Sequence, residues 1–460
     1  MSEKQSTQQG QSVLYQLEGR PPIHQALPMS FQHIFAMFTG NIAPILIIAE
    51  IVGNLSSADE LLMVQAAMLM SGLATLLQVY PIKIGKLQIG SGLPLVMGTA
   101  FAFVPVMSTT AAAFGIPAIL GATLAGGIAM VLMGVFIKYL KPLFPPIVVG
   151  SVLLAIGMNL LPTGARYFAG GGNPQTNPNF GSWQNLLIGF TVFVIITIIN
   201  RFGKDMLKNV GLLVGIVAGY GMAACMGLVN FAPVREAAWF GLPTFLPFTP
   251  TFHAESILSF AAIFLVLGLE TMGNMSGITN GIFDRDPTTQ ESSGGIIANG
   301  LTSQLGALFG AFPSSAFGQN TGIVLMTRVI NRFCFALAGI IMVCTSFMPK
   351  IGALFSSMPQ SVLGGAVITV FAMIFLNGFK MISRDGLTDR NVLMLCVTFG
   401  LGYALGLVPE VTAKMPAFVQ FIFGDPVTAV CVVSVIANLI FPGRKEDEAR
   451  RADKNATKQV

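Results

Sequence analysis

The chain has 460 residues, of which 53% are hydrophobic and only 10% are charged, and its mean hydropathy is +0.73. A soluble domain carries about 25% charged residues, so this composition excludes a soluble enzyme, a soluble nucleic-acid-binding protein and a disordered chain. A membrane-spanning helix needs about 20 apolar residues, and the length suffices for about a dozen or more of them. We therefore expect an all-α polytopic membrane protein.

The residues that usually bind metals or form disulfides are scattered along the chain. The five cysteines lie singly in apolar stretches, without a C-x-x-C spacing, which argues against disulfides and zinc. His24, His33 and His253 are too far apart in the sequence to indicate a metal site. The N-terminal residues are mostly polar, so no cleavable signal peptide is expected. We expect neither a metal ion nor a bound cofactor.

Apolar runs predict fourteen membrane spans. The first seven cover approximately residues 30–50, 60–80, 93–108, 115–140, 143–161, 185–200 and 209–230. The second seven cover approximately residues 255–277, 294–311, 319–330, 332–350, 358–378, 391–408 and 415–441. The third and tenth spans, 93–108 and 319–330, are too short to cross a membrane as plain helices.

The basic residues support this topology. With the N-terminus inside, most lysines and arginines fall in inner loops and in the two tails, as the positive-inside rule requires. Those that fall outside are Arg166, Arg235, Lys350 and Lys414. Because the count of spans is even, both termini are expected to be cytoplasmic. The net charge of +5 is explained by topology and requires no nucleic-acid partner.

The two halves of the chain resemble each other. Pro145-Pro-Ile-Val-Val-Gly150 begins the fifth span and Pro359-Gln-Ser-Val-Leu-Gly364 begins the twelfth. Spans seven apart have opposite orientations, which predicts an inverted repeat of seven plus seven spans. The same offset pairs the short spans 93–108 and 319–330, both preceded by Gly and Pro residues. Paired broken spans point to a transporter's binding site, although Gly and Pro are frequent in membrane helices generally.

Glu270 lies deep within the apolar span 255–277. An ionised carboxylate at the middle of a membrane costs at least about 2.5 kcal/mol. It must therefore face a cavity and bind a donor, or remain protonated. We favour a functional role for Glu270 over the alternative, a buried structural pair.

Four further residues have both a functional and a structural interpretation. Gln319 and Asn320 carry carboxamides that suit a heterocycle with alternating N–H and C=O groups, or that join helices. His33 could bind a proton or fill the core. Phe101 could stack on a planar ligand, although the residues alone favour core packing. Arg328 could act as a gate or extend to the inner membrane surface.

The residues from Gln319 to Arg328, Gln-Asn-Thr-Gly-Ile-Val-Leu-Met-Thr-Arg, resemble the Q-N-x-G-x-x-x-x-T-R motif of the nucleobase–ascorbate transporter family, also called nucleobase:cation symporter-2. The resemblance covers roughly residues 20–442, and within the family the chain is similar to the xanthine/uric acid permeases. Further matches are Gln32-His33-x-x-Ala36-Met37, Glu270-x-x-Gly273, and Pro359 with Gly364 and Gly365.

This resemblance implies a core domain, formed by spans 1–4 and 8–11, and a gate domain, formed by spans 5–7 and 12–14. It also implies an elevator-type motion, a homodimer and short β segments in spans 3 and 10. The corresponding ranges are a cytoplasmic segment 1–29, core parts 30–142 and 254–350, gate parts 143–253 and 351–441, and a cytoplasmic tail 442–460.

The resemblance also implies roles for individual residues. Substrate binding falls to Glu270, Gln319, Phe101, Ala100 and Gly318. Selectivity or gating falls to Asn320, Thr327 and Arg328, and coupling to Glu270, His33 and Asn299. Members with Gln at the first motif position resemble xanthine and urate carriers, whereas those with Glu resemble uracil permeases.

The chain departs from the family at Asn299. Many members have an A-D-G segment linked to proton coupling, where this chain has Ala298-Asn299-Gly300. Asn299 cannot titrate, so the proton must be carried by Glu270, with His33 as a second candidate, or the coupling differs.

The expected function is a proton symporter of a bacterial inner membrane that imports xanthine and/or uric acid, driven by the transmembrane proton gradient. Its partners would be the purine, protons, lipid and a second copy of the chain. One alternative is a uracil or pyrimidine permease of the same family. Another is an anion exchanger or channel with the same fold, against which the deep Glu270 argues. The sequence contains no catalytic constellation, so we do not expect an enzyme.

Overall fold

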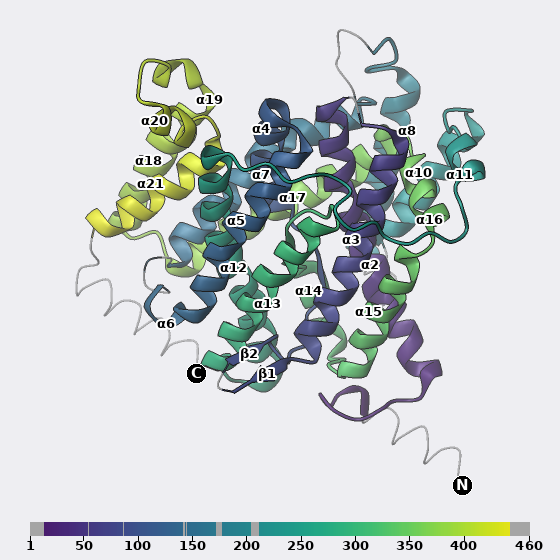
Figure 1. Cartoon of the computed structure of the whole chain (residues 1–460), viewed down its shortest axis with the longest axis horizontal. Helices are drawn as coiled ribbons and strands as arrows, with labels where there is room; N and C mark the ends of the chain where they lie inside the picture. Colours follow the sequence, from purple (N-terminus) through teal and green to yellow (C-terminus); the bar gives the residue numbers. More distant parts are fainter. Residues whose placement is uncertain are drawn as a thin grey trace. The chain divides into compact units, whose positions relative to one another are not determined.

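The structure is a computed structural model of the whole chain, and it describes residues 13–53, 55–85, 87–140, 143, 145–171, 177–203 and 211–441 (Figure 1). The chain divides into two compact units, one formed by the residues up to Ile137 with Pro162–Val370, the other by Lys138–Leu161 and the residues from Phe371 onward. Much of the two expected cytoplasmic ends, 1–29 and 442–460, lies outside the described residues. Several basic residues that were expected on the inner side also lie outside them. The limits of the core and gate domains remain predictions.

Eight helices in the described part of the chain are long and apolar enough to cross a membrane. They are α2 (Ile23–Val52), α3 (Ser57–Val79), α5 (Ile116–Val135), α7 (Pro146–Phe168), α8 (Trp183–Phe202), α12 (Ala254–Phe283), α17 (Gln360–Asp385) and the continuous stretch Asp389–Leu407. A ninth span results if α15 (Arg332–Ser346) and α16 (Pro349–Ser356), which meet at a bend of 90°, are counted together. The expected class, an α-helical multi-pass membrane protein, is confirmed.

The other predicted spans coincide with shorter or more polar helices. The short ones are α4 (Val104–Phe114), α10 (Gly211–Cys225), α14 (Gly318–Thr327) and α21 (Pro426–Ile440), and the polar one is α13 (Thr289–Leu308). The count of fourteen spans therefore stays a prediction. The remaining short helical elements are η1 (Phe101–Phe103), α6 (Ile137–Leu140), α11 (Ala232–Glu236), η4 (Pro409–Thr412) and α20 (Ala417–Ile422).

Several helices begin and end at residues that satisfy their free backbone groups. The Ser56 side chain accepts a hydrogen bond from the backbone N–H of Asp59 at the start of α3. Thr288 and Glu291 form a capping box at the start of α13. Gly53 ends α2 in the left-handed conformation, at φ 69°, which a glycine adopts without strain.

Small residues allow the long helices of the first unit to approach closely. In Figure 1, α5 lies beside α12 and α13, and α3 lies beside α15. A Cβ atom added to Gly126 of α5 would lie 2.9 Å from the Cβ of Phe260 on α12. One added to Gly72 of α3 would lie 2.5 Å from the carbonyl oxygen of Gly339 on α15. These glycines allow backbone contact that a larger residue would prevent.

Two short antiparallel strands interrupt the helical architecture, as expected for the regions of the short spans. β3 (Met97–Thr99) pairs with β4 (Ser314–Ala316), and Gly98 lies opposite Ser315. The Ala100 N–H donates to the Pro313 carbonyl at 2.8 Å, and the Phe317 N–H donates to the Val96 carbonyl at 2.9 Å. Each strand leads directly into a helical segment. A hairpin, formed by β1 (Ile82–Ile84) and β2 (Leu87–Ile89), was not expected.

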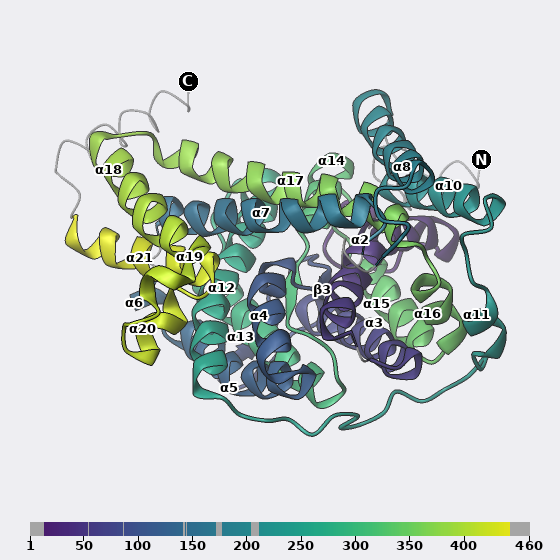
Figure 2. The ribbon, with the colours of Figure 1, turned by 90° about the horizontal axis from the view of Figure 1, so that it is seen from above.

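In the second unit, the two segments that begin with the repeated motif lie in close contact. A Cβ on Gly150 of α7 would lie 2.8 Å from the carbonyl oxygen of Gly378 on α17. The C-terminal part comprises α18 (Asp389–Val397), the π-helix η3 (Thr398–Tyr403), α19 (Ala404–Leu407), α20 and α21 (Figure 2). The Arg390 guanidinium donates to the Asn438 side-chain oxygen at 2.8 Å, joining α18 to α21.

Candidate functional site

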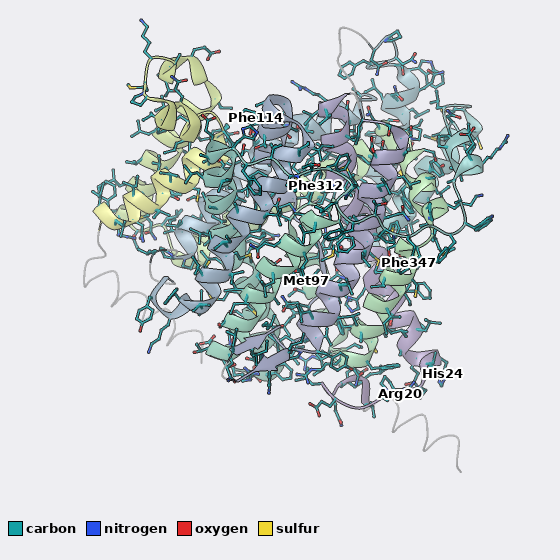
Figure 3. All side chains as sticks on the ribbon, viewed as in Figure 1. Arg20, His24, Met97, Phe114, Phe312 and Phe347 are labelled. Atoms are coloured by element: carbon teal, nitrogen blue, oxygen red, sulfur yellow. The ribbon has the colours of Figure 1, made fainter. Side chains whose placement is uncertain are left out.

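The first strand of the broken-span pair, β3, is held by side chains from α2 and α3. Asn41 Oδ1 accepts hydrogen bonds from Ser71 Oγ at 2.8 Å, from the Thr99 N–H at 2.8 Å and from Thr99 Oγ1 at 2.9 Å. The Met97 N–H donates to Thr75 Oγ1 at 3.0 Å. β3 lies beside α2 and α3 in Figure 2, and Met97 lies in the interior in Figure 3. Buried polar side chains thus replace the backbone partners that a continuous helix would supply.

The second strand, β4, is held in the same manner by α12 and α13. The Asn274 amide on α12 donates to the Ala316 carbonyl at 3.1 Å. The Ser314 N–H donates to Ser303 Oγ on α13 at 3.0 Å, and Ser314 Oγ donates to Asn299 Oδ1 at 3.1 Å. Both strands are therefore fixed in position by buried hydrogen bonds.

A helix starts immediately after each strand. η1 and α4 follow Ala100, and α14 follows Phe317. The first turn of a helix has free N–H groups and a partial positive charge, which favours carbonyl oxygens and anions. Ala100 and the Phe317 N–H lie at opposite ends of the strand pair because the strands are antiparallel. Gly318 is exposed and Gln319 is partly exposed, so the start of α14 is accessible.

Glu270 on α12 lies at this accessible end. α12 runs parallel to α14: a Cβ on Gly318 would lie 3.4 Å from Asn274 Oδ1, and one on Gly277 would lie 3.5 Å from Thr321 Cγ2. Glu270 precedes Asn274 by four residues and therefore shares its face of α12. This places Glu270 one turn beyond the contact with Gly318, in front of the first turn of α14.

The two polar side chains predicted to bind substrate are unpaired. The side chains of Glu270 and Gln319 form no hydrogen bond with any residue that the structure describes, and both residues are partly exposed. Polar groups this deep in a membrane protein are normally hydrogen-bonded. A free acceptor at Glu270 and a free carboxamide at Gln319 can together bind a ligand that has both N–H and C=O groups.

Two phenylalanine rings lie beside the strand pair, one of them predicted and the other missed. A Cβ atom added to Gly40 would lie 3.5 Å from the Phe101 ring and 3.4 Å from the Phe317 ring. A Cβ atom added to Gly98 would lie 2.5 Å from the Phe317 ring. Phe317 directly follows β4, as Ala100 and Phe101 follow β3, and this parallel in the sequence could have identified it.

His33 is joined to Asn320. The Asn320 amide donates to the His33 carbonyl at 2.9 Å and lies 3.1 Å from His33 Nδ1. The amide NH2 group of Asn320 can donate hydrogen bonds but cannot accept them. His33 Nδ1 is therefore the acceptor, which makes it the unprotonated nitrogen of a neutral imidazole. The His33 ring lies 4.4 Å from the Phe335 ring, between centroids. Asn320 thus fixes α14 to α2 rather than pointing to an open site.

Asn299 joins α12 to the strand pair. Its amide donates to Thr271 Oγ1 at 3.0 Å, while its Oδ1 accepts from Ser314 Oγ at 3.1 Å. Thr271 directly follows Glu270, so Asn299 connects the helix turn of Glu270 with β4. Asn299 is fully buried and acts through neutral hydrogen bonds.

Thr327 and Arg328 lie at the other end of α14. Thr327 Oγ1 donates to the Ile323 carbonyl at 2.8 Å. Arg328 ends the helix in the left-handed conformation, at φ 56°, and is exposed. A ten-residue helix is about 15 Å long. These two residues are therefore distant from Gln319, and their predicted effect on selectivity or gating would be indirect.

Residues 24–411 match the permease family Xan_ur_permease. Over 424 residues the chain is 35% identical to the uric acid permease PucJ of Bacillus subtilis, covering 91% of this chain and 93% of that protein. It is 33% identical to the xanthine permease of the same organism, covering 91% and 94%. It is 29% identical to the xanthine permease XanQ of Escherichia coli, covering 95% and 96%.

Solved structures of anion transporters have a similar fold. The transmembrane domain of the cyanobacterial bicarbonate transporter BicA superposes with a TM-score of 0.55 at 15% identity, covering 92% of this chain and 99% of that one. SLC26A9 superposes with a TM-score of 0.62 at 11% identity, covering 91% and 66%. At these identities the likeness concerns the fold alone.

Proposed function

Because this chain belongs to the permease family that includes the uric acid and xanthine permeases, we propose that it imports xanthine and/or uric acid together with protons. It is a transporter rather than an enzyme, and its relatives are nucleobase permeases. The proposed location is a bacterial inner membrane, with both termini in the cytoplasm.

The observation that carries this proposal is the pair of unpartnered polar groups at the start of α14. Among the described residues, the side chains of Glu270 and Gln319 have no hydrogen-bond partner. An oxopurine presents N–H and C=O groups along one edge, so a carboxylate can accept from it while a carboxamide both donates and accepts. The first-turn N–H groups next to Gly318 add donors for a carbonyl oxygen. Phe101 and Phe317 supply flat apolar surfaces for the ring.

The selectivity follows from the neutral side chain at position 319. Gln319 can pair with a purine without adding negative charge beside Glu270. A second carboxylate would repel urate, which is an anion at neutral pH. Asn320, Thr327 and Arg328 would influence selectivity through the position of α14 rather than by contact with the base.

We assign the coupling proton to Glu270. Asn299 cannot titrate, and His33 Nδ1 already accepts a hydrogen bond from Asn320. Glu270 is unpaired within the described part of the chain, so it is free to exchange a proton as substrate binds. An uncharged Glu270 would avoid the cost of moving a carboxylate through the membrane.

The proposed mechanism is elevator-type motion of a core domain against a gate domain, in a homodimer of fourteen-span protomers. The two strands are held by hydrogen bonds from corresponding helices of the two halves, which favours an inverted repeat. Asn41 and Thr75, from α2 and α3, bind β3, whereas Asn274 and Ser303, from α12 and α13, bind β4. Broken spans related in this manner are typical of secondary transporters.

Uptake of labelled xanthine and urate into proteoliposomes, with and without an inward proton gradient, tests the proposal. We expect gradient-dependent accumulation of at least one of these purines that uracil does not inhibit. Inhibition by uracil would favour a pyrimidine permease. Bicarbonate or chloride exchange without purine uptake would favour an anion exchanger.

A further inference from the structure

Arg332, the first residue of α15, forms bonds that its position in the sequence does not predict. Its guanidinium donates to the Gly92 carbonyl twice, from Nε at 3.0 Å and from Nη2 at 2.7 Å. Nη1 donates to Glu18 Oε1 at 3.2 Å. Arg328, four residues earlier, has no side-chain partner in the described part of the chain. Of these two arginines, Arg332 is therefore the one that links other segments.

Gly92 and Arg332 belong to the segments that flank the two broken spans. Gly92 leads into Leu93–Val96 and β3, and its own N–H donates to the Gln78 carbonyl at 2.7 Å. Arg332 follows the short link after α14. Gly92 has φ 74°, and a Cβ there would lie 3.0 Å from Arg332 Nη2, so a glycine suits both the backbone and the approach of the guanidinium.

The N-terminal segment, residues 13–20, supports this link from the other side. The Asn331 amide lies within 3.3 Å of four carbonyl oxygens of the segment, of which the nearest is that of Val13 at 3.0 Å. The Ile330 N–H donates to the Leu14 carbonyl at 3.1 Å, and Leu14 is buried. Arg20 lies over the Phe333 ring, 5.2 Å from its centroid. The segment runs beside the start of α15 in Figure 1, and Figure 3 shows Arg20 at this edge.

The other broken-span strand has a comparable support without a charged group. The long connection between α11 and α12 runs along the edge of the unit in Figure 2. Its Leu246 N–H donates to the Leu308 carbonyl at 2.7 Å, shortly before β4. Its Thr251 N–H donates to the Pro117 carbonyl at 3.0 Å, at the start of α5, which follows α4. Backbone bonds make the connection there, whereas a guanidinium makes it at Gly92.

We propose that Arg332 is a positioning residue that fixes the segment before β3 relative to the end of α14, with residues 13–20 as its brace. A guanidinium has a planar fork that directs two N–H groups at one acceptor, which a lysine cannot reproduce. Through this fork Arg332 keeps β3, which leads into η1 and Phe101, at a constant spacing from α14, which carries Gln319. This inference deepens the proposed function, and its test by transport kinetics rests on that function.

Hydrogen–deuterium exchange on the purified, ligand-free protein tests the link independently of any substrate. In Arg332→Lys, the amides of Gly92 to Thr99 should exchange about tenfold faster, as expected when a hydrogen bond from a charged group is lost. Gly92→Ala should produce the same change from the other side of the link. Glu18→Gln should change exchange by less than about twofold, because Glu18 is 84% exposed. Peptides from α21 provide an internal reference for global unfolding.

Transport kinetics distinguish positioning from a general loss of structure. For Arg332→Lys and Gly92→Ala we expect KM for the transported purine to rise about tenfold while the maximal rate per folded protein changes by less than about threefold. Arg235→Gln, at an exposed arginine of α11, is the matched control and should behave as wild type.

Unchanged exchange at Gly92 to Thr99 in Arg332→Lys, or an unchanged KM, would overturn the positioning role. Faster exchange that includes α21 would also overturn it, since the arginine would then serve global stability. If the wild-type protein transported no purine while the exchange result held, the proposed function would fail and the link would stand.

Discussion

Asn299 donates a hydrogen bond to Thr271, with 3.0 Å between Nδ2 and Oγ1, and accepts one from Ser314, with 3.1 Å between Oδ1 and Oγ. A neutral amide thus joins β4 to the helix turn that carries Glu270. Thr271 Oγ1 donates its own proton to the Leu267 carbonyl at 2.9 Å. An aspartate at position 299 could therefore keep both bonds only while protonated, because a carboxylate has no donor.

Asn299→Asp should therefore make stability depend on pH. The protonated aspartate reproduces the Asn299 pattern, so the variant should be close to wild type at acidic pH. As pH rises the carboxylate loses its donor and is buried without a counterion, and the melting temperature should fall. Thermal unfolding of both proteins across a pH series measures this difference.

Asn299→Ala is the matched variant for this measurement. It removes both bonds at every pH, and should lower the unfolding free energy by about 1–3 kcal/mol without a new pH dependence. A melting temperature for Asn299→Asp that follows wild type at all pH values would contradict the role of the Thr271 bond.

Gly98→Ala should weaken purine binding. The added Cβ would lie 2.5 Å from the Phe317 ring, which must move away from β3. We expect a loss of about tenfold in affinity, the size that overpacking commonly produces. Isothermal titration of the purified variant with xanthine and urate measures it.

Gly221→Ala provides the control for Gly98→Ala. It makes the same substitution on α10, where nothing lies within 4 Å of the added Cβ. Wild-type affinity in both variants would show that the Phe317 ring is not part of the site.

The ion pair formed by Arg285 and Glu291 should stabilise the fold, and this stabilisation should be lost in acid. Partial burial would raise the pKa of Glu291, but hydrogen bonds from Arg285 and Thr288 lower it below its ordinary value. A lowered pKa stabilises the fold above the ordinary glutamate value, and this contribution is lost as pH falls through the lowered pKa. Glu291→Gln should remove about 1 kcal/mol or less at neutral pH and flatten the acid limb of the melting curve.

The exposed Glu236 is a suitable comparison, because Glu236→Gln should leave the acid limb unchanged. If the melting temperature changed equally with pH in wild type and in Glu291→Gln between neutral and acidic pH, the ion pair would contribute no stability.

Gln319→Glu should alter selectivity. A second carboxylate beside Glu270 removes the donor at position 319 and adds negative charge, so urate affinity should fall by about tenfold or more. Uracil affinity should fall less or increase. Competition of unlabelled bases against labelled xanthine uptake measures the order of affinities, and an order identical to wild type would remove Gln319 from the site.

The sequence predicted those features that depend on local chemistry. A single carboxylate in an apolar run made Glu270 a candidate, because charge in the membrane is costly wherever it lies, and its role stays a prediction. Short, Gly- and Pro-interrupted runs identified the regions of β3 and β4, since a length below one membrane thickness is visible without any tertiary contact. The short strand expected in the third span is confirmed as β3, whereas its partner β4 lies just before the predicted tenth span, 319–330.

Features that depend on tertiary contacts were missed. Phe317 looked like any apolar residue until its ring was found against Gly98. Arg332 was counted only as an inner basic residue, because its bond to Gly92 joins residues far apart in the sequence. The β1–β2 hairpin lies in a short connection between predicted spans, where hydrophobic periodicity carries little information.

Equilibrium binding of xanthine and urate to the purified protein tests the central claim most directly, with wild type compared with Glu270→Gln in the same detergent and at the same pH. The account predicts saturable binding of at least one of these purines to wild type and a loss of about a hundredfold or more in Glu270→Gln, since the carboxylate that accepts from the purine would be removed. Equal affinity of the two proteins would contradict it.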